Sequence, residues 1–137
     1  KATLADGSYH DVDSSDMAFQ LCARTGFREA FLKTKPVLLE PIMKLEVEVP
    51  SDFQGAVTGE LNKRRGLIVS TETVGNSSTI IAEVPLAETF GYSTDLRSAT
   101  QGQGVFTMEF FKYRSMPANV QKEVVDERKQ AELAAAK

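Results

Sequence analysis

Cysteine and histidine, two residue types that commonly build catalytic or metal sites, are scarce in this 137-residue sequence. It has one cysteine, Cys22, and one histidine, His10, so it can form no internal disulfide and has no Cys/His set for zinc. Cys22 lies in an apolar stretch and is predicted to be a buried, inert thiol, whereas His10 is predicted to lie in a surface turn. No apolar run approaches the ~20 residues that span a bilayer. These scarcities argue against a disulfide-rich, zinc-dependent or membrane-spanning protein.

The sequence also lacks a surplus of positive charge. Its 16 Lys and Arg residues stand against 19 Asp and Glu residues, which gives a net charge of −3. Proteins that bind nucleic acid on their own usually carry a basic surface, because neutralising phosphates supplies most of their affinity. Any contact with RNA is therefore expected to be local and to be supported by other parts of a larger protein.

The common catalytic motifs are absent as well. Neither the phosphate-binding pattern GxxxxGK[ST] nor GxGxxG occurs. Glu46 and Glu48 alternate along one predicted strand, where a solvated face explains them better than acid–base chemistry. A small acyl-phosphate hydrolase is one hypothesis for a chain of this size. Its anion-binding loop would fall at 50–52, where Asp52 brings negative charge that would repel the anion. We therefore expect that this stretch of chain is not itself an enzyme.

Hydrophobic periodicity divides the sequence into parts. Residues 4–13 are typical of a strand end with a turn at Asp6-Gly7, and a helix is predicted over 15–33. Because that helix is apolar on more than one face, residues 1–36 are interpreted as the end of another α/β domain, and the chain as a piece of a longer one. Residues 37–40 are predicted to be a linker, 41–115 a second domain, and 116–137 a helical tail.

The second domain is predicted to have the element order β-α-β-β-α-β. A capping box at Ser51 and Gln54 should begin its first helix, and Gly66 should end that helix in a left-handed conformation. The second helix should restart at Gly91 and end at Gly102. The predicted strands are 43–49, 67–74, 79–85 and 105–113. This order predicts an α+β, ferredoxin-like fold, a four-stranded antiparallel sheet with both helices on one face.

Two polar clusters are candidate binding sites. In "GYSTDLRSATQGQG" (91–104), Arg97, Ser98 and Gln101 fall on neighbouring positions of a glycine-flanked helix end, which suits hydrogen bonding to a folded RNA loop. A solvated helix end is the simpler alternative. In "NKRRG" (62–66), Lys63, Arg64 and Arg65 are candidates for a phosphate contact, although basic residues at a helix C-terminus also complement the helix dipole.

Long blocks of the sequence resemble the C-terminal end of the elongation factor G family, the translocation GTPases of bacterial and organellar ribosomes. The blocks are "LADGSYHDVDSSDMAF" (4–19), "KPVLLEPIMKLEVEVP" (35–50), "GELNKRRG" (59–66), "AEVPLAETFGYSTDLRSATQG" (82–102) and "FTMEFFKY" (106–113). The resemblance covers roughly residues 1–118. It implies that 1–36 are the end of domain IV and that 41–115 are domain V, which in this family docks between the region of ribosomal protein L11 and the sarcin–ricin loop of the large-subunit rRNA.

The resemblance also implies roles for the polar cluster and for the rest of the protein. The stretch "LRSATQ" matches the family segment that touches the sarcin–ricin loop, which assigns that contact to Arg97, Ser98 and Gln101. GTP and Mg²⁺ would be bound by a G domain outside this chain, which itself would need no cofactor. The expected partners are the ribosome and the protein's other domains. A cytoplasmic monomer without membrane association is implied, or one in an organellar matrix.

Two alternatives remain open at this point. One is a related translation factor with the same tail, such as a ribosomal protection protein or a paralogue of elongation factor G. The other is a stand-alone RNA-recognition module of the same element order, which stacks bases on exposed aromatic residues of its sheet. Phe106, Phe110, Phe111 and Tyr113 on the last strand are its candidates, so the sheet face opposite the helices distinguishes the two.

Overall fold

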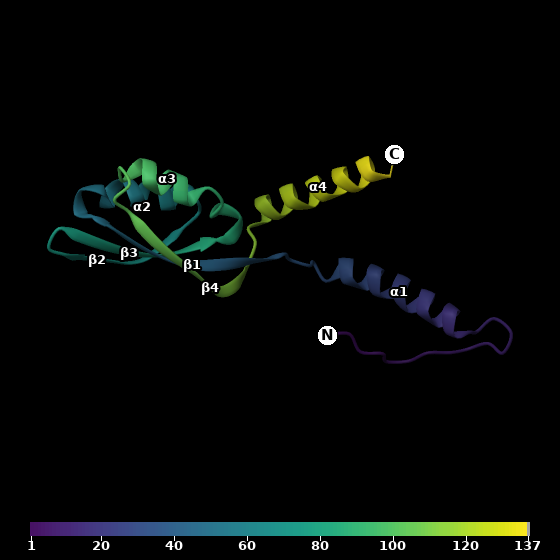
Figure 1. Ribbon diagram of the computed structural model, residues 1–137. Helices are drawn as coiled ribbons and strands as arrows, with labels where there is room; N and C mark the ends of the chain where they lie inside the picture. Colours follow the sequence, from purple (N-terminus) through teal and green to yellow (C-terminus); the bar gives the residue numbers. More distant parts are fainter. Residues whose placement is uncertain (137) are drawn as a thin grey trace. The chain divides into compact units, whose positions relative to one another are not determined.

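A computed structural model describes residues 1–136 of the chain. These residues form two units, Lys1–Val37 and the chain from Leu38 onward, which are described separately. Figure 1 labels their helices and strands.

The first unit consists of an irregular segment and one helix, α1 (Asp16–Lys33). The Oγ of Ser15 accepts a hydrogen bond from the N–H of Ala18 (3.2 Å) and caps the helix start, as predicted. The strand predicted within 4–13 is wrong, because those residues adopt no strand. Cys22 is exposed, so its predicted burial is also wrong. The segment before α1 lies beside the helix near Phe19 and Cys22, but none of the helix residues is buried within this unit.

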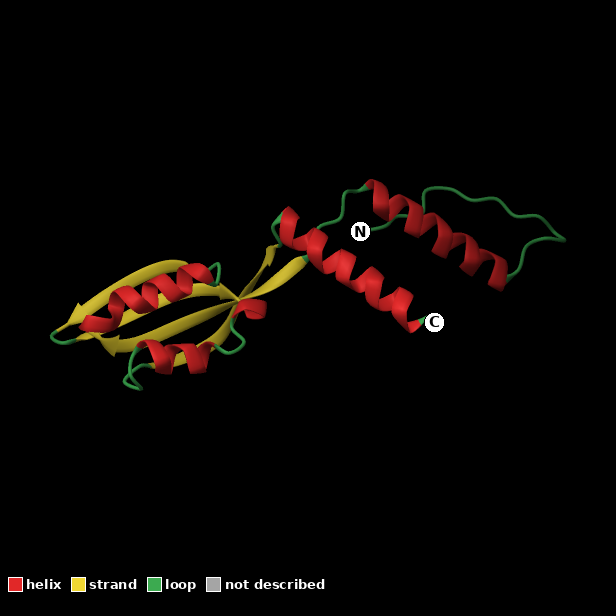
Figure 2. Ribbon diagram, turned by 90° about the horizontal axis from the view of Figure 1, so that it is seen from above, coloured by secondary structure: helices red, strands yellow, loops and turns green. Residues whose placement is uncertain are grey.

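The second unit is the ferredoxin-like domain that the sequence predicts, followed by a helical tail. Its elements are β1 (Leu39–Pro50), η1 (Ser51–Phe53), α2 (Gln54–Lys63), β2 (Leu67–Val74), β3 (Ser77–Pro85), η2 (Leu86–Glu88), α3 (Tyr92–Ala99), β4 (Val105–Ser115) and α4 (Ala118–Ala135). The sheet order is β2-β3-β1-β4, and every neighbouring pair is antiparallel. Helices α2 and α3 cover the same face of this sheet (Figures 1 and 2).

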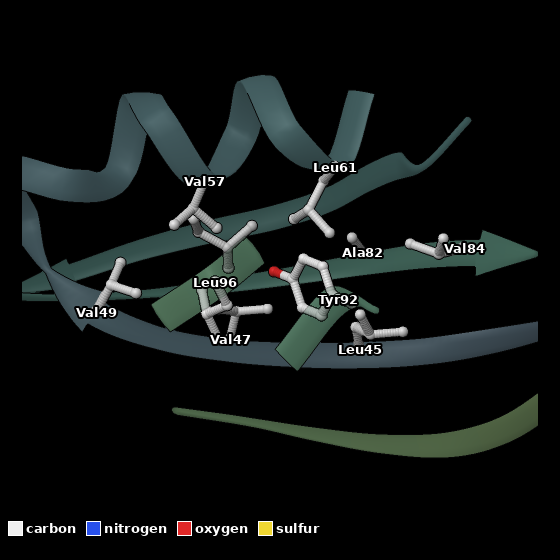
Figure 3. Close-up of a cluster of buried hydrophobic side chains, with 10 residues drawn as sticks. Leu45, Val47, Val49, Val57, Leu61, Ala82, Val84, Tyr92 and Leu96 are labelled. Atoms are coloured by element: carbon white, nitrogen blue, oxygen red, sulfur yellow. The ribbon is translucent and has the colours of Figure 1, made fainter. Parts of the chain in front are cut away.

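The core lies between this sheet face and the two helices. Along β1, Leu45, Val47 and Val49 are buried while Glu46 and Glu48 are exposed, which is the alternation expected of a sheet covered on one face. Figure 3 shows these residues meeting side chains from α2, α3 and β3. The buried cluster comprises Leu45, Val47, Val49, Val57, Leu61, Ile80, Ala82, Val84, Tyr92 and Leu96.

Strand β1 starts earlier than predicted. Leu39 and Glu40, which the sequence places in a linker, pair with Ser115 and Arg114 of β4. Pro41 is tolerated inside the strand because pairing with β3 begins only at Ile42, so one edge of β1 is free of a partner strand at the proline. The predicted linker therefore contributes its second half to the sheet.

Two details at the ends of α2 also differ from the predictions. The helix starts after a 3₁₀ turn and has no capping box, because Gln54 Oε1 instead accepts a hydrogen bond from Ser78 Oγ (3.1 Å) on β3. The left-handed residue after the helix is Arg65 (φ 56°), not Gly66. Gly66 is required for a different reason, since a Cβ there would lie 2.6 Å from the carbonyl oxygen of Leu61.

The tail forms the helix predicted for it, α4, up to Ala135, and Lys137 lies outside the described residues. The connection to the tail is tied to the start of β1. The N–H of Met116 donates to the carbonyl of Leu38 (2.8 Å), and the N–H of Leu38 donates to Oε1 of Gln121 (3.1 Å). Within residues 1–136, no helix combines the length and apolar character needed to cross a membrane.

Candidate nucleic-acid interface

Helix α3 presents the first candidate cluster to solvent. Tyr92 and Leu96, four residues apart, are buried and anchor one face of the helix to the core. Arg97 and Ser98 therefore fall outside that buried face, and both are exposed, as is Gln101. Gly91 (φ 75°) supplies the left-handed turn that lets the chain leave η2 and start α3, as the sequence predicts.

The end of α3 is a defined turn. Gln101 (φ 53°) and Gly102 (φ 80°) are both left-handed, and the N–H of Gly102 donates to the carbonyl of Arg97 (2.8 Å). This is the six-to-one hydrogen bond of a Schellman motif. Glycine or asparagine usually occupies the first left-handed position, so glutamine at 101 costs up to about 1 kcal/mol of conformational free energy. A residue kept in such a conformation is a candidate for a binding function.

A buried hydroxyl fixes the loop that follows. Thr100 is fully buried, and its Oγ1 donates to the carbonyl of Leu96 (2.7 Å) and accepts from the N–H of Gly104 (2.9 Å). A Cβ at position 104 would lie 2.8 Å from that oxygen and 3.0 Å from Val49 Cγ1, so only glycine fits. The polar residues are therefore carried by a pre-organised turn, which reduces the entropy lost when a ligand binds.

The chemical capacity of this surface is hydrogen bonding, not catalysis. Among residues 1–136, the side chain of Arg97 has no ion-pair or hydrogen-bond partner, so its planar guanidinium remains available for a phosphate or a guanine edge. The hydroxyl of Ser98 and the amide of Gln101 can each donate and accept. A shallow depression borders Arg97, and its lining residues are Ser93, Leu96, Arg97, Gly104, Val105 and Phe106.

The second candidate cluster contains three cations with different environments. The Lys63 side chain is 78% exposed, and its Nζ lies 3.6 Å from Glu60. Arg64, by contrast, is 14% exposed and is held by groups of α2, η2 and α3. Arg65 forms a two-pronged ion pair with the buried Glu40 (3.1 and 3.0 Å). The fold thus uses both arginines internally, and of these three cations Lys63 is the one left exposed for a phosphate.

The Arg65 ion pair extends to a third residue. Its Nε donates to Glu88 Oε1 (3.1 Å), and the hydrogen bond with Glu40 is the main cause of a raised pKa at Arg65. Glu40 and Glu88 lie 25 and 23 residues from Arg65 in sequence. No local spacing could have revealed these partners, which is why the sequence suggested a free phosphate-binding cluster.

The open face of the sheet carries charged residues at its centre. Lys44 pairs in register with Glu83 on one side and with Glu109 on the other, so charged residues occupy the middle of this face. Phe106 instead packs edge-on against Tyr92 in the core, with ring centroids 5.1 Å apart. Phe110, Phe111 and Tyr113 of β4 are exposed, so of the four candidate aromatic residues Phe106 is the one that packing against the core withdraws from base stacking.

His10 and the carboxylates form no metal site in the part of the chain that is described. His10 is exposed, and its Nδ1 lies 3.5 Å from Asp13 on the same loop. Within residues 1–136, no three His, Cys, Asp or Glu side chains are grouped so that they could hold a metal ion.

Comparisons with known proteins agree with this architecture. The family model described as "Elongation factor G, domain IV" matches residues 1–35, and the model "Elongation factor G C-terminus" matches residues 37–124. The chain is 60% identical over 134 residues to an elongation factor G of Rhodopirellula baltica, covering 98% of the chain and 19% of that protein. It is 57% identical over 127 residues to elongation factor G 1 of Syntrophus aciditrophicus, covering 93% of the chain and 18% of that protein.

A solved structure supports the same assignment. A crystal structure of a protein from Thermus thermophilus superposes with a TM-score of 0.74 at 44% identity, covering 91% of this chain and 19% of the other. The chain thus spans about a fifth of the length of the proteins it matches. Because the C-terminus model covers more than half of its residues, the chain belongs to the elongation factor G family.

Proposed function

We propose that this chain is the ribosome-docking part of a GTP-dependent translocase, and that the end of α3 contacts the sarcin–ricin loop of the large-subunit rRNA. Membership of the family supports the ribosome as partner. The observation that carries the assignment to α3 is its exposed, unpaired Arg97, held with Ser98 and Gln101 on a pre-organised turn.

The geometry suits a compact RNA loop for physical reasons. A guanidinium can bind a phosphate with two parallel hydrogen bonds or bind the edge of a guanine. Ser98 and Gln101 add hydrogen bonds that adapt to a folded backbone. Because the chain is acidic overall, a few well-placed contacts must supply the affinity, and neighbouring domains must share the docking.

The remaining roles follow from the same proposal. GTP hydrolysis, with its Mg²⁺, belongs to a G domain outside this chain, so the chain itself contributes no catalytic site and binds no cofactor. Lys63 is the candidate for an additional rRNA phosphate contact, and the region of ribosomal protein L11 is the second docking neighbour. The protein would act as a monomer in the bacterial cytoplasm or in an organelle.

A chimeric factor tests this function. This chain would replace the matching segment of the Rhodopirellula baltica elongation factor G, and GTP turnover would be measured against ribosome concentration. Arg97→Ala removes a charge-assisted contact and should raise the KM for ribosomes at least about tenfold, since one such contact contributes roughly 1.5–3 kcal/mol.

Arg128→Ala on α4 is the matched control, because Arg128 is also exposed and has no partner among residues 1–136. Its KM should stay within about twofold of the unsubstituted chimera. An Arg97→Ala chimera with an unchanged KM at subsaturating ribosomes would overturn the proposed contact.

A further inference from the structure

We propose that Arg64, the residue that closes α2, is a positioning residue for the RNA contact made by α3. Its side chain joins α2 to the η2–α3 junction and thereby sets the orientation in which α3 presents Arg97. This inference rests on the proposed function, and its test is designed to separate the two.

The contacts of Arg64 all converge on the start of α3. Its Nη1 donates to the carbonyl oxygens of Glu88, at the end of η2, and of Phe90 (3.1 Å). Its Nη2 donates to the carboxylate of Asp95, within the first turn of α3. Its Nε donates to Glu60 (3.2 Å), which lies one turn earlier on α2. One guanidinium therefore bridges two helices and the turn between η2 and α3.

The aromatic ring of Tyr92 also contacts the Arg64 side chain. The Arg64 guanidinium carbon lies 5.4 Å from the centre of the Tyr92 ring, at a distance that permits a cation–π interaction. Tyr92 is buried and is the first residue of α3. Arg64 thus contacts the backbone before the helix, the ring of its first residue and a carboxylate of its first turn.

Helix α3 is short enough for this attachment to control its whole length. It has eight residues, and Asp95 lies only two positions before Arg97. Gly91, directly before the helix, has the left-handed conformation, and the turn is closed by a hydrogen bond from the N–H of Tyr92 to the carbonyl of Thr89 (3.1 Å). The hydrogen bonds from Arg64 to Glu88, Phe90 and Asp95 span this glycine on both sides.

The role requires the planar fork of arginine. A lysine ammonium carries its three donors on one atom and cannot reach acceptors on opposite sides as a guanidinium does. Arg64→Lys should therefore keep the charge and most of the buried stem while it releases part of the junction. Asp95→Asn, which removes one of the carboxylate partners, is a milder change of the same attachment.

The test uses the chimeric factor and its KM for ribosomes in GTP turnover. Arg64→Lys should raise the KM about fivefold with little change in kcat, and Asp95→Asn should raise it about twofold. In an Arg97→Ala background, Arg64→Lys should change the KM by less than about 1.5-fold, because a residue that acts through Arg97 loses its effect once Arg97 is removed. Arg128→Lys, the same substitution at an exposed arginine of α4, is the control and should leave the KM unchanged.

The outcomes separate the two proposals. If Arg97→Ala alone has no effect, the proposed rRNA contact is wrong. If Arg97→Ala has its effect but Arg64→Lys raises the KM by the same factor with and without Arg97, or does not raise it at all, Arg64 is not a positioning residue and the rRNA contact stands. Where Arg64→Lys lowers the yield of folded protein, the same cycle with Asp95→Asn decides.

Discussion

Helices α2 and α3 end in the same backbone motif but use it in opposite ways. In each, a long polar residue takes the left-handed conformation, Arg65 after α2 and Gln101 after α3, and a glycine follows. The N–H of each glycine donates to the carbonyl five residues earlier, from Gly66 to Leu61 (2.9 Å) and from Gly102 to Arg97 (2.8 Å). The two turns occupy equivalent places in the two β-α-β halves of the fold.

The difference lies in the acidic partners. At the end of α2, carboxylates from β1, η2 and α3 surround the two arginines and hold them within the domain. At the end of α3, no carboxylate among residues 1–136 reaches Arg97. In one half of the fold, the residues at this turn therefore form ion pairs that hold the domain together. In the other half, the residues at the same turn are exposed and form a rigid binding surface.

Replacing one arginine at the end of each of the two helices should give the largest difference in stability. Arg65→Ala leaves Glu40, which is 4% exposed, without its partner and should lower the free energy of unfolding by about 2–3 kcal/mol. Arg97→Ala should lower it by less than about 0.5 kcal/mol, because the side chain is exposed and unpaired. Urea unfolding of the 137-residue chain measures both. Equal losses of unfolding free energy in the two variants would contradict the different roles given to the two helix ends.

Alanine at the two equivalent glycines should sharpen the comparison. Gly66→Ala places a Cβ 2.6 Å from a backbone oxygen and should destabilise the domain by about 2 kcal/mol, since backbone must shift. Gly102→Ala meets no atom within 4 Å, and its cost of about 1 kcal/mol comes only from the left-handed φ of 80°. Gly55→Ala inside α2, with open space and ordinary φ, is the control and should stabilise slightly. The thermal unfolding midpoint should be lowest for Gly66→Ala, intermediate for Gly102→Ala and highest for Gly55→Ala.

Tyr92 links the two ends, because it starts α3 and lies against Arg64. Burial raises the pKa of Tyr92 to about 12 from its usual 10.0, so the unfolded chain loses this proton at lower pH than the folded domain. The unfolding free energy should therefore be unaffected below pH 10 and fall as pH rises toward 12, by about 1 kcal/mol at pH 11. The Tyr92→Phe variant should not show this decrease in unfolding free energy, because phenylalanine has no proton to lose. Parallel decline in both proteins between pH 9 and 11 would show that Tyr92 is not the group responsible.

A small, stabilising effect is expected at Gln101. Gln101→Gly relieves the left-handed strain and should raise the unfolding free energy by about 0.5–1 kcal/mol. The same change should weaken ribosome binding by the chimeric factor, because the amide is lost. A variant that is more stable but binds less well would separate strain from function at this residue. A Gln101→Gly chimera that binds as tightly as its parent would remove Gln101 from the interface.

Local sequence patterns predicted much of this structure. The four predicted strands, the alternation along β1 and the restart at Gly91 all depend on neighbouring residues, and the structure confirms them. The exposure of Arg97 follows from the spacing of Tyr92 and Leu96. Arg64 and Arg65 are held in ion pairs by Asp95, Glu40 and Glu88. Because these partners are distant in sequence, periodicity could not predict that the two arginines are unavailable for a phosphate. The exposure of Cys22 likewise depends on what covers α1, which its own apolar pattern does not specify.

The most direct measurement is cleavage of rRNA by hydroxyl radicals released from a tethered iron chelate. The chelate would be attached to Gln101→Cys, or to Glu109→Cys on β4 as the control, in a chimeric factor bearing Cys22→Ser and no other reactive cysteine. With the factor bound to ribosomes, position 101 should cleave the sarcin–ricin loop, and position 109 should cleave it far more weakly. Equal cleavage from both positions, or none from position 101 while the factor is bound, would contradict the docking of α3 on this loop.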